Sequence, residues 1–400
     1  MKTNANPAST VQLLRALLMN ARLMTAGPRI DWFLLKYLSK FTVVDVDGKL
    51  VLHSHMPPLN SKAYRKFVRQ HVLSKSIRPS HAQIGVTNAC PQGCEYCYSK
   101  NRRGTPMDFA TICATIEQLT DLGVFWLGLT GGEPLLNRHL PHIVERAGEE
   151  CSVKLFTTGV GLTSEKVREL KSAGLFSVSV SMDHPSEDVH DRIRKFPGAH
   201  RAAMDALQSF LSVGGIHVGV SAVLSREMLR EPEVERFLEF LEGLGIHEAW
   251  LSEAKPSSAE SWREGVVITS GEREMLIRIQ ERHNRRGGMT VNYLGHFEDA
   301  RAFGCTAGHK MVYVDAFGEV SPCVFLPMSF GNVSKTPIKE IYSGMVERFP
   351  VRSTCFVNSN VEVLSRHYRG QYPISREESE SIAGEAHPYP PSQFFKLLYR

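Results

Sequence analysis

The stretch HAQIGVTNACPQGCEYCY, residues 81–98, joins an apolar run to a loop with three closely spaced cysteines. The run HAQIGVT (81–87) is mostly apolar and bounded by polar residues, which is typical of a buried strand. Directly after it, Cys90, Cys94 and Cys97 follow one another at spacings of four and three residues. The stretch therefore predicts a first strand with a metal-binding loop at its carboxyl end.

Five further strand-like runs follow, and helix-like runs separate them. The strand-like runs are 124–130, 153–158, 175–181, 217–223 and 248–252. The helix-like runs are 107–121, 139–149, 164–173, 200–213, 232–243 and 271–284. Six consecutive βα units predict a parallel sheet covered by helices, either open or curled into a partial barrel. Ligands of such sheets bind at the carboxyl ends of the strands.

Length and composition restrict the class of protein. The chain has 400 residues, which is too long for one ordinary domain, and 42% of them are hydrophobic. Arg or Lys interrupts every apolar stretch well before 18 residues, so neither a spanning helix nor a signal-peptide core is expected. A cytoplasmic chain with eight cysteines favours metal binding or buried thiols over disulfides. Cys113 and Cys151 stand outside any motif and are expected to be buried thiols.

Three thiolates on one short loop suit a particular kind of metal group. They can hold three irons of a [4Fe–4S] cluster and leave the fourth iron open to another ligand. Zinc is a competing interpretation, but zinc sites usually present paired Cys-x2-Cys units and a fourth nearby ligand. Chance clustering of core cysteines is the remaining alternative.

The cysteine loop resembles the cluster motif of the radical SAM superfamily, Cys-x3-Cys-x2-Cys with an aromatic residue, here Tyr96, before the third cysteine. The resemblance implies that the open iron binds S-adenosylmethionine. Reductive cleavage of this cofactor would give a 5′-deoxyadenosyl radical that abstracts hydrogen from a substrate. LTGGEP (129–134) follows the second strand and resembles the family's GGEP motif. Backbone groups of Gly131, Gly132 and Glu133 are thereby implied to face the cofactor's amino group.

Weaker matches end the later strands. FTTG stands where relatives often carry Thr-Asn-Gly, with Thr158 in place of Asn. SVSMD (179–183) and the following HDRIR resemble the family's pattern before its fourth helix. The resemblance makes Ser181 and Arg194 candidates for the cofactor's carboxylate and ribose, with a surface salt bridge as the alternative for Arg194. Ser221 is a further candidate for the ribose hydroxyls.

The C-terminal part resembles SPASM and twitch domains through CTAG, VDAFGEVSPC and FGN. Such domains carry one or two auxiliary iron–sulfur clusters. The candidate thiolates are Cys305, Cys323 and Cys355, which are too few for two fully Cys-ligated auxiliary clusters. The fourth ligand is left open among His309, His367, a substrate atom and solvent. A degenerate domain that keeps the fold without a cluster is the alternative.

The N-terminal segment has its own charge and pattern. Residues 1–80 contain 13 Lys or Arg and three Asp, a net charge of +10, whereas the remaining chain carries −5. Residues 10–25 predict a helix, and TVVDVDGKLVL predicts a hairpin around Asp47-Gly48. The apolar face of the helix comprises Leu14, Leu17, Leu18, Ala21 and Met24. The segment is interpreted as a cap on the main domain or as a helix on an anionic membrane surface.

Together these patterns predict an α/β protein. Its core, residues 81–285, is a partial (βα)6 TIM-like barrel, followed by a small α+β twitch-like domain with a tail (286–400). A basic helical and hairpin extension (1–80) precedes it. The resemblance implies a radical SAM enzyme that needs a reductant such as flavodoxin or ferredoxin.

The substrate class stays open between two alternatives. A peptide or protein is the first, and a lipid or isoprenoid at the inner face of the membrane is the second. A rival of another class is a non-catalytic iron–sulfur electron carrier or zinc scaffold. GGEP argues against it, because a carrier needs no site for a cofactor's amino group. No nucleic-acid partner is expected, and the location is expected to be cytoplasmic, with peripheral membrane contact as an option.

Overall fold

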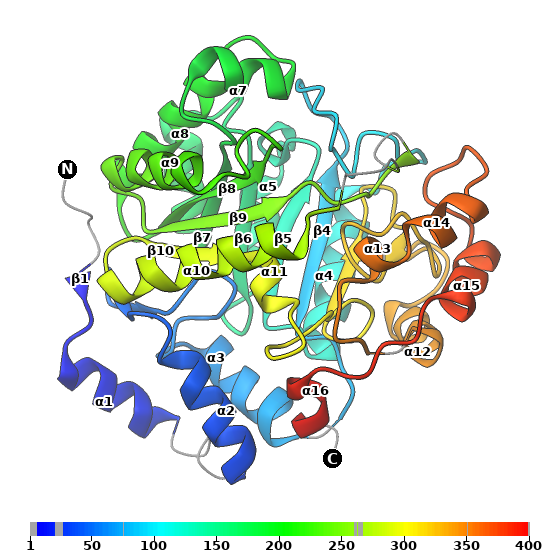
Figure 1. Cartoon of the computed structure of the whole chain (residues 1–400), viewed down its shortest axis with the longest axis horizontal. Helices are drawn as coiled ribbons and strands as arrows, with labels where there is room; N and C mark the ends of the chain where they lie inside the picture. Colours follow the sequence, from blue (N-terminus) through cyan, green and yellow to red (C-terminus); the bar gives the residue numbers. More distant parts are fainter. Residues whose placement is uncertain are drawn as a thin grey trace.

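The computed structural model describes residues 6–20, 27–74, 76–259, 262, 267–349 and 351–398. Its centre is one sheet of nine strands with helices packed around it (Figure 1). The strand order is β10-β9-β8-β7-β6-β5-β4-β11-β12. All neighbours from β10 to β11 run parallel, and β12 pairs antiparallel with β11. The sheet is open, with β10 and β12 at its two edges.

The six predicted strands are present, and two further strands, β10 and β11, extend the parallel sheet. The predicted strands are β4 (His81–Thr87), β5 (Trp126–Gly131), β6 (Ser152–Thr157), β7 (Ser177–Ser181), β8 (His217–Leu224) and β9 (Glu248–Glu253). The others are β10 (Thr290–Tyr293), β11 (Met311–Val314) and β12 (Val320–Ser321). β11 and β12 form an antiparallel pair around Phe317-Gly318. β11 also pairs in parallel with β4, so the sheet has more strands than the six predicted βα units supply.

The helices of the core lie between the strands, as alternation requires. Their bounds are α4 (Phe109–Leu122), α5 (Leu140–Arg146), α6 (Ser164–Ser172), α7 (Glu187–Arg194), α8 (Ala199–Val213), α9 (Glu231–Gly243) and α10 (Ser270–Arg286). Local caps fix several of them. The Asp108 carboxylate accepts the Thr111 N–H at 2.8 Å, and Thr269 with Glu272 forms a capping box at the start of α10.

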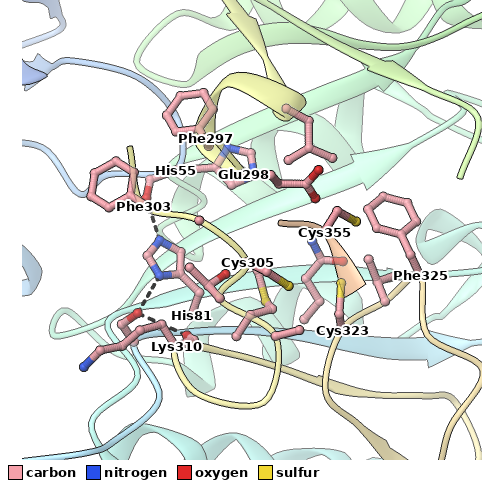
Figure 2. A pocket seen from close by; sticks show the side chains of 18 of the residues that line it. His55, His81, Phe297, Glu298, Phe303, Cys305, Lys310, Cys323, Phe325 and Cys355 are labelled. Atoms are coloured by element: carbon pink, nitrogen blue, oxygen red, sulfur yellow. Dashed lines mark hydrogen bonds between the residues drawn. The ribbon is translucent and has the colours of Figure 1, made fainter. Parts of the chain in front are cut away.

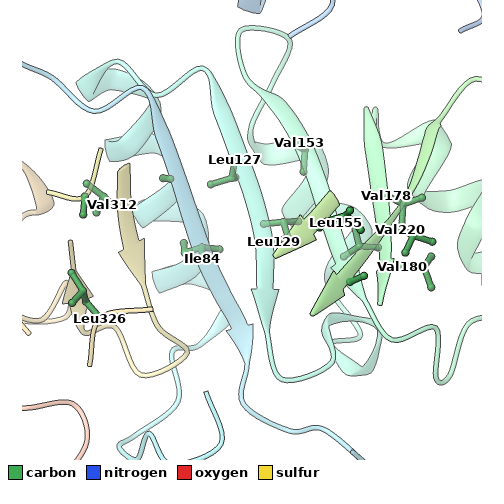
Figure 3. Packing of buried hydrophobic residues seen from close by; sticks show 14 of the residues in the cluster. Ile84, Leu127, Leu129, Val153, Leu155, Val178, Val180, Val220, Val312 and Leu326 are labelled. Carbon is green, nitrogen blue, oxygen red and sulfur yellow. The ribbon is translucent and has the colours of Figure 1, made fainter. Parts of the chain in front are cut away.

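A single apolar cluster runs from the core sheet into the C-terminal region. Side chains such as Ile84, Leu129 and Leu155 are fully buried between strands and helices, and Val312 on β11 extends the row past β4 (Figure 3). Leu326, beyond β12, belongs to the same cluster. The strand ends that carry the motifs are therefore held by a continuous core.

The N-terminal extension consists of helices and a small sheet. Its elements are β1 (Asn6–Pro7), α1 (Thr10–Met19), α2 (Pro28–Leu38), β2 (Val44–Val46), β3 (Lys49–Val51), α3 (Lys62–Phe67) and the π-helix η2 (Val68–Leu73). The predicted hairpin is confirmed as β2 and β3. The predicted first helix is present to Met19, whereas Ala21 and Met24 and the side chain of Leu17 lie outside the described residues.

The C-terminal region adds short helices, of which α12 to α15 gather at the right of Figure 1, whereas α11 lies against β9 and β10. They are α11 (Leu294–Phe297), α12 (Ile338–Arg348), α13 (Phe356–Ser359), α14 (Val361–His367), α15 (Arg376–Glu385) and α16 (Gln393–Leu398). Helix α16 returns to the N-terminal extension, where Leu398 packs with Ile30 and Leu34 of α2. In the described part of the chain, no helix is both long and apolar enough to cross a bilayer.

Candidate active site

The cysteine loop leaves the carboxyl end of β4 and packs against the end of α7. The backbone N–H of Gly93 donates to the carbonyl oxygen of Arg194 at 3.0 Å. The Cys94 sulfur lies 4.0 Å from the same oxygen. Cys94 is buried, Cys97 is half-buried and Cys90 is exposed. The loop is thus fixed at its middle cysteine, and its other thiols lie nearer the surface.

The thiols of this loop suit an iron–sulfur cluster. Desolvation by burial raises the pKa of Cys94, so metal binding has to displace its proton. In a cubane each thiolate binds a different iron, and Cys90, Cys94 and Cys97 provide three thiols on one short loop for such a cluster.

A buried ion pair lies directly behind the loop. The Arg194 guanidinium donates a hydrogen bond from Nη2 to the Asp183 carboxylate at 2.9 Å, and its Nε lies 2.8 Å from the other oxygen of that carboxylate. The Tyr96 hydroxyl donates to the same carboxylate, and Arg194 lies 5.6 Å from the centre of the Tyr96 ring. Burial opposes the charged guanidinium, but the Asp183 carboxylate outweighs it and raises the pKa of Arg194.

This arrangement gives Arg194 a positioning role toward the loop. Its Nη1 lies 4.0 Å from the Cys94 sulfur, and its side chain is only 7% exposed. The surface salt bridge considered from the sequence is therefore wrong, because the ion pair is buried. A contact of Arg194 with the cofactor stays a prediction.

The GGEP stretch lies against the backbone that leads into the cysteine loop. The N–H groups of Gly132 and Glu133 donate to the carbonyls of Thr87 and Ala89, each at 2.7 Å. A Cβ atom on Gly131 would lie 2.1 Å from the Thr87 oxygen, and one on Gly132 would lie 2.2 Å from the Ala89 oxygen. Gly131 also has a φ of +118°, which side chains rarely tolerate. Both glycines are required for this close approach.

The Glu133 side chain has a structural task. Its Oε1 accepts hydrogen bonds from the Leu135 N–H at 2.9 Å and the Thr157 hydroxyl at 2.7 Å. Its Oε2 accepts the N–H and the hydroxyl of Thr158. The carboxylate thus ties the end of β5 to the end of β6. Thr158, which replaces the Asn of relatives, keeps a polar contact here.

Two serines lie side by side on neighbouring strands, Ser181 as the last residue of β7 and Ser221 three residues before the end of β8. Ser181 of β7 and Ser221 of β8 are direct register partners, and both are half-buried. Ser221 also lines the cavity described below. Their hydroxyls are therefore available at the carboxyl ends of the strands, where the cofactor is predicted.

The three C-terminal cysteines come together around one cavity. Cys305, Cys323 and Cys355 all line it (Figure 2). Burial raises the pKa of all three thiols, that of Cys323 to about 12. The two histidines considered as a fourth ligand are engaged elsewhere. His309 Nε2 lies 2.9 Å from the Phe349 carbonyl, and His367 lies 2.7 Å from Glu385.

Two charged side chains that the sequence did not reveal lie beside these cysteines. The Lys255 ammonium lies 3.7 Å from the Cys355 sulfur and donates to Glu253 at 2.9 Å and Glu298 at 2.7 Å. Glu298 lines the cavity with the cysteines (Figure 2). Lys255 follows β9 and Glu298 follows α11, and neither belongs to a motif. A carboxylate next to three thiols is a candidate fourth ligand that sequence spacing could not suggest.

The cavity has a volume of about 290 Å³ and lies between the sheet, the N-terminal extension and the C-terminal cysteines. Most of its wall is apolar. Its aromatic side chains are Tyr37, Phe67, Phe125, Phe156, Trp250, Phe297, Phe303, Phe325, Phe356 and Phe394. His55 and His81 lie at the end opposite the cysteines (Figure 2). Burial lowers the pKa of His81 to about 4, so its imidazole is neutral near pH 7.

Comparisons with known proteins agree with this geometry. A family model described as the radical SAM superfamily matches residues 84–241, and one described as an iron-sulfur cluster-binding domain, SPASM, matches residues 305–360. An AdoMet-dependent heme synthase of Oleidesulfovibrio alaskensis is 24% identical over 284 residues, covering 64% of this chain and 72% of that protein. A PqqA peptide cyclase of Gluconobacter oxydans is 28% identical over 270 residues, covering 64% of this chain and 75% of that protein.

A solved structure shares the fold. The crystal structure of Streptococcus suis SuiB bound to S-adenosylmethionine superposes with a TM-score of 0.60. The two chains are 14% identical, and the match covers 76% of this chain and 80% of that one. At this identity the likeness concerns the arrangement of the sheet and helices alone.

Proposed function

Because the chain belongs to the radical SAM superfamily and carries a SPASM domain, we propose that it removes a hydrogen atom from a substrate held in the apolar cavity. The observation that carries the proposal is the packing of GGEP against the cysteine loop at the ends of β4 and β5. When bound at Cys90, Cys94 and Cys97, a [4Fe–4S] cluster supplies the electron that cleaves S-adenosylmethionine.

The protein's own residues orient the cysteine loop and the cofactor, and they shield the substrate from water. Arg194 and Asp183 hold the loop that carries the thiols, and Glu133 keeps the GGEP backbone turned toward the strand ends. The hydroxyls of Ser181 and Ser221 are the proposed partners of the cofactor's polar groups. The aromatic wall excludes water from the substrate's C–H bond, which protects a reactive site from side reactions.

The direct test of this function is anaerobic reconstitution with iron and sulfide, followed by addition of S-adenosylmethionine and a reductant such as reduced flavodoxin or ferredoxin. Release of 5′-deoxyadenosine, measured by chromatography, is the expected result. Reconstituted enzyme that binds iron but releases no 5′-deoxyadenosine would refute the proposal.

Two substrate classes have support. A peptide or protein is supported by the similarity to a protein named as a peptide cyclase. A lipid or isoprenoid is supported by the cavity itself. Its volume of about 290 Å³ is at the lower end of small-ligand pockets, and its wall is mostly apolar. The wall favours the second class, because polar side chains make up a small part of it and offer few partners for the backbone groups of a peptide.

The apolar cavity leads to a binding prediction. We expect the enzyme to bind cis-parinaric acid, a fluorescent fatty acid, and Ser252→Trp to weaken this binding by at least about tenfold, because an indole would occupy space that the chain needs. Ser252 ends β9, lines the cavity and is half-buried. Fluorescence titration measures the affinity. The matched control Ser252→Ala should bind within about twofold of wild type. Equal binding by both variants would contradict the prediction.

The C-terminal cysteines lead to a prediction on iron content. We expect more than about four irons per reconstituted chain, and a return toward about four in Cys305→Ala and Cys323→Ala. The reason is that these thiols, with Cys355, line one wall of the cavity and form a second donor set. Iron and sulfide analysis with electron paramagnetic resonance measures the change. Cys151→Ala, which removes a buried thiol outside both sets, is the control. A wild-type count of four would support the degenerate-domain alternative.

A further inference from the structure

We propose that the exposed surface of α1 and α2 docks on an anionic phospholipid bilayer, and that an apolar substrate chain passes from the bilayer into the cavity beneath α2. The inference rests on the proposed function and specifies lipid as its substrate class. It is carried by three properties of these helices: the two faces of α2, the exposed apolar residues of α1, and their charges.

Helix α2 separates the cavity from the surface. On its inner face, Leu34 is 7% exposed and lines the cavity together with Tyr37. On its outer face, Trp32 is 70% exposed and Leu35 is 58% exposed. One apolar face of α2 is thus buried, and the described residues leave the other apolar face exposed. Helix α2 therefore lies between the apolar cavity and a patch of exposed apolar side chains on the protein surface.

Helix α1 adds to this outer surface, and both helices lie along the lower edge of the molecule in Figure 1. Its large apolar side chains are strongly exposed. They are Val11 (60%), Leu14 (55%), Leu18 (75%) and Met19 (48%). A helix of 10 residues and one of 11 are far shorter than the roughly 20 residues that a spanning helix needs. They suit a position within the headgroup region, where Trp is the favoured anchor.

The charges of the surface identify an anionic partner. Arg15, Arg29 and Lys36 are exposed, and none of them forms an ion pair with a described residue. Asp31 is the one acidic residue of the two helices, and its carboxylate accepts the Gly27 N–H at 3.3 Å. A second copy of the chain would bring like charges together, whereas anionic lipid headgroups neutralise them. The bilayer is therefore favoured over a homodimer.

Co-sedimentation of the reconstituted full chain with vesicles tests the docking. The probes are vesicles of phosphatidylglycerol with phosphatidylcholine and vesicles of phosphatidylcholine alone, each at low and high salt. We expect binding to the anionic vesicles that weakens with salt but persists in part. Trp32→Asp should lower the partition coefficient by at least about tenfold. Each of Arg15→Gln, Arg29→Gln and Lys36→Gln should lower it about fivefold.

A matched control variant and a second measurement distinguish insertion of Trp32 into the bilayer from electrostatic attraction to its surface. Phe109→Asp removes another exposed aromatic residue, 39% exposed, at the start of α4, and should bind vesicles like wild type. Vesicles of brominated phosphatidylcholine mixed with phosphatidylglycerol should quench part of the tryptophan fluorescence. Trp32→Phe should remove that quenching while keeping the binding, because Trp126 and Trp250 are buried and Trp262 is half-buried against Tyr368 in the C-terminal region.

The outcomes decide between partners. No binding to anionic vesicles at low salt would overturn the inference. So would a dimer in sedimentation equilibrium that Trp32→Asp dissociates, since it would assign the surface to a second copy. Release of 5′-deoxyadenosine without vesicles tests the proposed function separately. A chain that cleaves S-adenosylmethionine but ignores vesicles would refute the docking alone.

Discussion

Cys94→Ala is expected to reduce the formation of 5′-deoxyadenosine by at least about 100-fold, since even the loss of an outer partner of a metal ligand costs about 10–100-fold. Cys94 is the buried member of the loop and lies next to Arg194. Its removal leaves Cys90 and Cys97, two thiols for a cluster that requires three. Chromatography of anaerobic reactions measures the product, and iron analysis should show a parallel loss.

The control for this experiment is another buried thiol. Cys113 lies on α4 outside both donor sets, so Cys113→Ala should release 5′-deoxyadenosine at close to the wild-type rate. A modest loss of stability is the expected cost of the small cavity that this change leaves. Undiminished product from Cys94→Ala would remove the assignment of the loop.

Asp183→Asn is expected to lower the free energy of unfolding by about 3–5 kcal/mol, because it leaves a buried guanidinium without its counter-ion. The Asp183 side chain is fully buried. Besides the hydrogen bond and the ion pair with Arg194, its Oδ1 accepts the N–H of Val223 at 2.9 Å. Asparagine keeps the shape but not the charge. Urea denaturation of the wild type and the variant measures the difference.

Two further variants test whether the loss of stability in Asp183→Asn comes from the unpaired buried charge of Arg194. Glu149→Gln removes an exposed carboxylate whose ion pair with Lys62 is at the surface, and it should change stability by less than about 1 kcal/mol. Adding Arg194→Met to Asp183→Asn should restore part of the loss, because the unpaired charge is then gone. If Asp183→Asn unfolds at the same urea concentration as the wild type, the ion pair does not stabilise the fold and cannot hold the cysteine loop in place.

Local pattern predicted the elements of the core well. The strands that became β4–β9 were recognised because each is an apolar run between helix-like runs, and the β2–β3 hairpin because Asp47-Gly48 favours a tight turn. The two cysteine sets were recognised from spacing and resemblance. These signals are all contained within a few neighbouring residues, which is what a single sequence records.

The contacts between distant segments could not be predicted in this way. β11 pairs with β4 across more than 200 residues, and no local pattern encodes that choice. Asp183 stood within a quoted motif, yet its partnership with Arg194 depends on how α7 returns to the loop. Lys255 and Glu298 carry no motif and meet Cys355 only because β9, α11 and the C-terminal region converge.

The parallel pairing of β11 with β4 has a consequence for the nascent chain. Until the ribosome has added Met311–Val314, β4 is an edge strand with one side of its backbone unpaired. Synthesis proceeds at about 5–20 residues per second, so this interval lasts roughly 10–45 s after β4 is made. An unpaired strand with buried residues such as Ile84 can add to a neighbouring chain. The pairing with β11 therefore closes this edge of β4 only late in synthesis.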